Sequence, residues 1–129
     1  PAVEQAIVEL RAHFAGHEVD AHDDGQGGAY VKVHTLPLGP TYAPARSWVA
    51  FRITFQYPHA DIYPHYLAPD VRRTDGKPLG EAFHVNHPWQ NAHRTEPATM
   101  VSRRSNRLNP KSDTAALKLS KILDWIRSR

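Results

Sequence analysis

The stretch that decides the fold is residues 47–73, SWVAFRITFQYPHADIYPHYLAPDVRR. Its first half alternates in polarity, a period typical of a half-buried strand. The apolar face carries Val49, Phe51, Ile53 and Phe55. Three prolines then follow within residues 58–70. Since proline lacks the N–H that a strand donates, we expect an ordered loop there rather than a central strand.

Outward from this stretch, the periodicity predicts one helix near each end of the chain. Apolar residues recur at helical spacing over 2–15 and 113–127, and Ser112 or Asp113 is the expected cap of the second helix. The strands expected between the helices are 17–24, 29–36, 47–57 and an edge-type strand within 66–73, followed by a long irregular segment at 77–110.

Helices and strands segregated in this order predict an α+β fold. We expect a single domain over residues 1–129, with an N-terminal helix, an antiparallel four-stranded meander, a long loop and a C-terminal crossover helix. Tyr57, Tyr63 and Tyr66 are expected to attach the proline-rich segment to the rest of the domain.

The composition is that of an ordinary globular protein. Of the 129 residues, 40% are hydrophobic and 22% are charged. No apolar run approaches the ~20 residues that a membrane-spanning helix needs. We therefore expect a cytoplasmic protein with no membrane partner. The chain has no dinucleotide fingerprint or phosphate-binding glycine loop, so no cofactor is expected.

The chain contains no cysteine. This excludes disulfides, thiolate zinc sites and thiol nucleophiles. The absence fits an intracellular protein, and it equally fits a protein whose native cysteine has been substituted.

The charge is unevenly distributed. Residues 1–65 hold 4 Lys and Arg against 7 Asp and Glu, whereas residues 66–129 hold 12 against 6. This asymmetry predicts a basic surface on the C-terminal half, either a solvated face or a site for an acidic partner or nucleic acid. Nucleic acid is the less expected partner, because no aromatic residue interrupts the basic run at 103–107.

Three features together resemble the ubiquitin-conjugating (UBC-like) and RWD domains. The first is the strand and Tyr-Pro segment of residues 47–69. The second is His87-Pro88-Trp89, where the family carries a His-Pro-Asn motif. The third is Asn109-Pro110, which leads into a helix containing Leu-Ser-Lys-Ile-Leu at 119–123. The resemblance implies a minimal, divergent member of bacterial type.

The chain departs from the family pattern in three ways. Trp89 replaces the motif asparagine, so Asn86 or Asn91 would have to take its place. The catalytic cysteine is missing, and the last two helices of the family are absent. These departures also allow a non-catalytic member, similar to the UEV domains.

The family places its nucleophile between the His-Pro motif and the crossover helix, which here is the window 90–110. Ser102 follows the apolar pair Met100-Val101 and is our candidate for a serine oxyester, with His87 or His93 as its base. An ordinary loop serine is the alternative. The candidate catalytic residues are Ser102, His87, His93 and Asn91, and the candidate partner-binding residues are Arg103, Arg104, Tyr63 and Trp89.

Three functions follow as hypotheses. The first is a conjugating-enzyme-like protein with a ubiquitin-like protein and an activating enzyme as partners. The second is a non-catalytic module that binds one of these partners. The third is a metal-binding protein, because His84, His87 and His93 lie close in sequence, with Glu81 or Glu96 to complete a ligand set.

Overall fold

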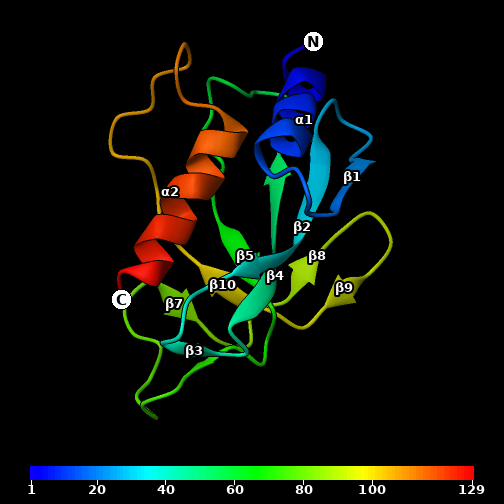
Figure 1. Ribbon diagram of the computed structural model, residues 1–129. Coiled ribbons are helices and arrows are strands. Elements are labelled where there is room, and N and C mark those ends of the chain that lie inside the picture. The colour runs from blue at the N-terminus through cyan, green and yellow to red at the C-terminus, as the bar shows by residue number, and fades with distance from the viewer.

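Both helices pack on one face of a six-stranded antiparallel sheet (Figure 1). The fold is described here from a computed structural model that covers all residues 1–129. The helices are α1 (Ala2–His13) and α2 (Ala115–Arg127). The strands are β1 (Val19–Asp23), β2 (Ala29–Pro37), β3 (Tyr42–Ala43), β4 (Arg46–Ile53), β5 (His65–Leu67), β6 (Arg72–Arg73), β7 (Phe83–His84), β8 (Trp89–Gln90), β9 (Thr95–Glu96) and β10 (Thr99–Val101).

The main sheet has the order β1-β2-β4-β5-β10-β7, and every neighbouring pair is antiparallel. The predicted α+β class is confirmed. The helices supply the expected apolar stripes. Ala6 and Leu10 of α1, Phe14 directly after it and six residues of α2 are buried in one core with the sheet. None of the helices is long and apolar enough to cross a membrane.

The β1–β2 hairpin forms because its turn satisfies its own polar groups. Asp24 Oδ1 accepts hydrogen bonds from the backbone N–H groups of Gln26 and Gly28, both at 2.8 Å. Gly28 is required there, since an added Cβ would lie 2.3 Å from the carbonyl oxygen of Ile53. The strands expected at 17–24 and 29–36 are therefore confirmed as the two arms of this hairpin.

Strand β4 is shorter than the predicted 47–57. Its apolar positions are buried as far as Ile53, but Phe55 is 66% exposed. The chain turns at this point, with the Tyr57 N–H donating to the Thr54 carbonyl at 3.0 Å. The strand therefore ends at the turn that begins at Thr54, before the chain reaches Pro58.

The prediction of a single edge-type strand within 66–73 is wrong, because this region contains parts of two separate strands, β5 and β6. β5 lies inside the sheet, paired with β4 on one side and β10 on the other. β6 instead pairs with β3 in a separate two-stranded ribbon. Pro69 separates the two pieces, since it cannot continue the ladder. Residues 77–110, predicted to be irregular, contain the four short strands β7 to β10.

Helix α2 begins later than expected. Thr114 is its N-cap, and its hydroxyl accepts a hydrogen bond from the Leu117 N–H at 3.1 Å. Asp113, one of the two expected caps, instead accepts from the N–H of Asn109 at 2.7 Å. Tyr57 behaves as predicted, because its hydroxyl accepts from the Ala115 N–H and joins the proline-rich segment to the helix.

The opposite face of the sheet is covered by the β8–β9 hairpin. Trp89 is buried there with Ala50 and Ala98, and Tyr30 and Tyr66 pack around it. The Trp89 ring meets Tyr30 at 5.9 Å and Tyr66 at 5.1 Å between centroids. The sheet is thus covered on both sides, by helices on one and by this hairpin on the other.

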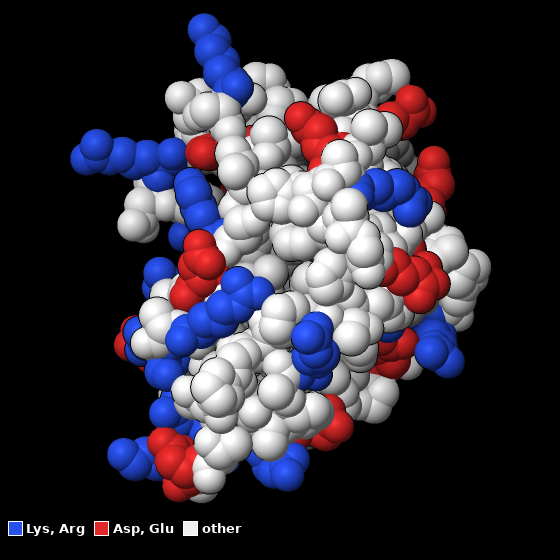
Figure 2. Space-filling model, viewed as in Figure 1, with Lys and Arg blue, Asp and Glu red and all other residues white.

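The basic half of the sequence produces a basic side of the molecule. On the face drawn in Figure 2, Lys and Arg gather along the left side, where Figure 1 places α2 and the loop that leads into it. Acidic residues are more scattered. The side that carries α2 is therefore the positively charged one.

His65 on β5 is fully buried, although it lies in the proline-rich segment 58–70 that the sequence predicts to be a loop. Neither ring nitrogen has a hydrogen-bond partner, and the ring packs 5.1 Å from Phe51. Burial, with the Lys118 charge adding to it, lowers the His65 pKa from 6.5 to about 3. The imidazole is therefore neutral in the folded protein at physiological pH.

We predict that His65 destabilises the fold in mild acid. The unfolded chain takes up a proton below pH 6.5 and the folded protein does not, so stability falls as pH falls. The free energy of unfolding should drop by about 2 kcal/mol between pH 7 and pH 5. Ordinary carboxylates titrate below this window. His65→Leu should remove most of the drop in urea denaturation, and the exposed His59→Leu should keep it. An unchanged drop in His65→Leu would show that His65 is not its source.

Candidate functional site

Ser102 directly follows β10, and its side chain meets His84 on the neighbouring strand β7. Ser102 Oγ lies 2.8 Å from His84 Nε2 and 3.3 Å from the Ala82 carbonyl. The Ser102 N–H also donates to Ala82 O at 2.8 Å, which extends the ladder by one residue. The hydroxyl has one proton and His84 is its closer partner. With Nε2 unprotonated, this pair has the geometry of a nucleophile and its base.

His84 was not among the bases predicted for Ser102. The two residues meet because β10 pairs with β7 in the register Met100↔His84 and Val101↔Phe83. The sequence indicates His84 only as a candidate metal ligand. Nothing in the local sequence shows that the two-residue strand β7 lies beside β10.

His87 lies next to this pair without touching Ser102. The centroid of the His87 ring is 5.6 Å from that of the His84 ring. The backbone N–H of His87 donates to the Ala98 carbonyl at 3.2 Å. His87 is exposed. It therefore borders the candidate base, while the direct hydrogen bond to Ser102 belongs to His84.

His93 and Asn91 lie in the β8–β9 hairpin, away from Ser102. Asn91 Oδ1 accepts from the His93 N–H at 2.8 Å and closes the hairpin turn, and the His93 ring packs 5.0 Å from His22 on β1. β1 and β10 are four strand spacings apart in the sheet, roughly 19 Å. The structure therefore does not bring His93 and Asn91 to Ser102.

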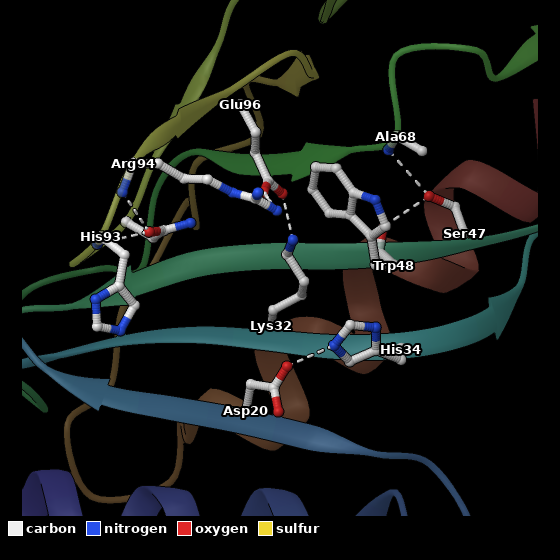
Figure 3. Close-up of polar contacts among 10 residues, drawn as sticks. Asp20, Lys32, His34, Ser47, Trp48, Ala68, His93, Arg94 and Glu96 are labelled. Atoms are coloured by element: carbon white, nitrogen blue, oxygen red, sulfur yellow. Dashed lines mark hydrogen bonds and ion pairs between the residues drawn. The ribbon is translucent and has the colours of Figure 1, made fainter.

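Ion pairs attach the β8–β9 hairpin, which carries His93 and Asn91, to the main sheet (Figure 3). Lys32 on β2 forms an ion pair with Glu96 on β9 and lies 4.3 Å from the centroid of the Trp48 ring. Arg94 reaches the other Glu96 oxygen at 3.3 Å. Trp89 is buried beneath, so its indole anchors the hairpin and faces no solvent.

The three histidines proposed as metal ligands do not converge. His84 and His87 are neighbours, but His93 contacts His22 in the hairpin. No group of three or more His, Asp or Glu residues in the chain is placed to hold a metal ion.

The loop after Ser102 is fixed by a buried ionic network. Lys118 on α2 is 8% exposed. Its Nζ donates to Asp61 Oδ2 at 3.1 Å, to Ser105 Oγ at 2.9 Å and to the Arg103 carbonyl at 3.0 Å. The Ser105 N–H and hydroxyl both donate to the Asp61 carboxylate. The network thus joins the proline-rich segment, the loop and the helix.

The network shifts the pKa of both ionised partners downward. Burial would raise the Asp61 pKa, but hydrogen bonds from Ser105 and Lys118 and the Lys118 charge more than offset it. Burial also lowers the Lys118 pKa, and the Asp61 carboxylate opposes that shift only in part. Asp61 is therefore held as a carboxylate.

Two arginines of the loop lie over aromatic rings. The Arg103 guanidinium is 4.8 Å from the centroid of the Trp125 ring, and that of Arg104 is 3.8 Å from the Tyr63 ring. Both arginines are exposed. Of the residues predicted to bind a partner, these two and the half-buried Tyr63 are accessible, whereas Trp89 is not.

The site therefore belongs to an α+β domain that places a Ser–His pair at the end of a sheet strand, beside an arginine-bearing loop. The sequence matches no model of a protein family. Comparison with the curated proteins and with the solved structures likewise finds no match. The function is therefore argued from the residues of the site.

We predict that Asp61 and Lys118 are energetically coupled. Asp61→Asn leaves a buried ammonium without its counter-ion and should lower the free energy of unfolding by about 3 kcal/mol. Lys118→Met should cost a similar amount. The double variant should cost less than the sum of the two, because neither charge is then left alone.

The measurement is urea denaturation of all four proteins at pH 7. Asp124→Asn is the matched control on the same helix, since its pair with Arg127 is exposed and should be worth less than about 0.5 kcal/mol. Strict additivity of the two single changes would contradict a coupled pair.

Proposed function

We propose that this chain is a UBC-like protein of a ubiquitin-like modification pathway, which accepts the C-terminus of a ubiquitin-like protein on Ser102. Two observations support the proposal. An N-terminal helix, antiparallel strands and a C-terminal helix follow one another in the order that the resemblance implies, although β7 and β10 of the expected loop belong to the sheet. The observation that carries the chemistry is the 2.8 Å contact between Ser102 Oγ and His84 Nε2.

The proposed reaction is an acyl transfer between three carriers. Ser102 Oγ attacks the carbonyl carbon of a thioester held by the activating enzyme, and its proton passes to His84 Nε2. The C–O bond forms, the C–S bond breaks, and the leaving thiolate takes the proton. An acceptor amine then attacks the oxyester, its nitrogen loses a proton through His84, and the Ser102 hydroxyl is restored.

The loop also offers groups for the negative charge that develops in this reaction. The backbone N–H groups of Arg103 and Arg104 donate to no protein acceptor, so both are free to bind an oxyanion. The two guanidinium groups add positive charge nearby.

A non-catalytic binding module is the second candidate, and one observation favours it. His84 Nδ1 makes no hydrogen bond in the chain, so no third group orients the imidazole. In this alternative the arginine-bearing loop and α2 bind the ubiquitin-like protein or its activating enzyme, and no acyl group is transferred to Ser102.

The acyl-transfer proposal predicts that Ser102 reacts with an activated ester. Incubation with p-nitrophenyl acetate should place one acetyl group on Ser102, seen by intact mass and peptide mapping. Ser102→Ala should abolish the label. His84→Gln should slow it on the order of 100-fold, the scale of general base catalysis.

Ser120 provides the matched control. Its Oγ lies 2.9 Å from His13 Nε2 on the exposed surface of the helices. The Ser–His distance is therefore similar to that of Ser102 and His84, but Ser120 does not lie at the end of a sheet strand. Ser120→Ala should label normally. Labelling that is insensitive to Ser102→Ala would exclude the acyl carrier. A hydroxylamine-sensitive adduct formed with ATP, the activating enzyme and the ubiquitin-like protein of the same genome would extend the result to the natural donor.

A further inference from the structure

The strongest charged feature outside the Ser–His pair is a groove between the 103–107 loop and α2, here called the α2 groove. Its volume is about 480 Å³. Five cationic side chains and one carboxylate line it: Arg103, Arg104, Arg107, Lys118, Lys121 and Asp113. Trp125 closes one side.

Most of the positive charge in the α2 groove is not neutralised. Lys118 is paired with Asp61, and Lys121 lies 3.8 Å from Asp113. Arg103, Arg104 and Arg107 form no ion pair with any carboxylate of the chain, and all three are exposed. Three guanidinium groups within five residues therefore face solvent with no counter-charge, which attracts an anionic ligand.

The arginines extend from a backbone that is already fixed. Ser105, in the middle of the loop, is bonded to Asp61 through both its N–H and its hydroxyl, at 2.6 and 3.0 Å. Lys118 holds the Arg103 carbonyl at 3.0 Å. A ligand that binds here does not have to order the loop first, and this lowers the entropic cost of binding.

The aromatic rings of the groove are already covered. Trp125 stacks on Phe83 with centroids 5.2 Å apart and planes 25° apart, while Arg103 and Arg129 lie over the indole. Single-stranded nucleic acid binds by stacking its bases on free rings. The α2 groove offers none, since the Tyr63 ring is covered by Arg104.

Carboxylates fit these arginines better than bases do. A guanidinium binds a carboxylate through two parallel hydrogen bonds. We propose that the α2 groove binds a short Asp- and Glu-rich segment of a protein partner. The inference does not rest on acyl transfer by Ser102.

The test is fluorescence anisotropy of a labelled octaglutamate peptide with the intact protein. Binding is expected at low ionic strength and should weaken as salt rises. The Arg103→Glu and Arg107→Glu double variant should weaken it by at least about tenfold. Arg46→Glu with Lys77→Glu makes the same change in net charge outside the groove and should leave affinity within about twofold.

Circular dichroism melting of each variant confirms that it is folded, and Arg103→Gln with Arg107→Gln repeats the test without added negative charge. Equal loss of binding in both double charge-reversal variants would overturn the proposal, because the effect would then be one of net charge. Tighter binding of octathymidylate than of octaglutamate would overturn it in favour of nucleic acid. The peptide carries no activated acyl group, so this result is independent of whether Ser102 can be acylated.

Discussion

The buried ammonium of Lys118 is the constraint on which the arrangement of the site depends. A charge at this depth is tolerated only when its hydrogen bonds are satisfied, and the groups that satisfy it come from two distant segments, Asp61 and the 103–105 loop. The helix, the proline-rich segment and the loop are therefore tied at one point. This point fixes the backbone of the arginine-bearing loop, since Lys118 bonds the Arg103 carbonyl, whereas Ser102 is placed by the pairing of β10 with its neighbouring strands.

The local parts of the fold could be predicted from the sequence, and the long-range parts could not. The two helices and the buried face of β4 follow from periodicity, which neighbouring residues determine. β7 and β10 are two and three residues long, too short for any pattern, and they exist because distant strands pair with them. The contact between Ser102 and His84 is a result of that pairing, so the sequence could offer Ser102 as a candidate but could not show which histidine lies beside it.

Burial of single polar residues was equally hard to predict. His65 lies within residues 58–70, where three prolines predict an ordered loop, and loops mostly lie on the surface. Its position is decided instead by β5 being enclosed between β4 and β10. Trp89 is a predicted partner contact, and the β8–β9 hairpin instead places it in the interior. In both cases tertiary packing overrides the composition of the neighbouring residues.

The packing of α2 against α1 has a consequence for how the chain is made. The two helices come from opposite ends of residues 1–129 and share one core with the sheet. During synthesis the apolar face of the sheet has no complete cover until α2 has left the ribosome, because α1 alone covers only part of it. Folding that depends on such late, long-range contacts is slow and leaves hydrophobic surface exposed in the nascent chain.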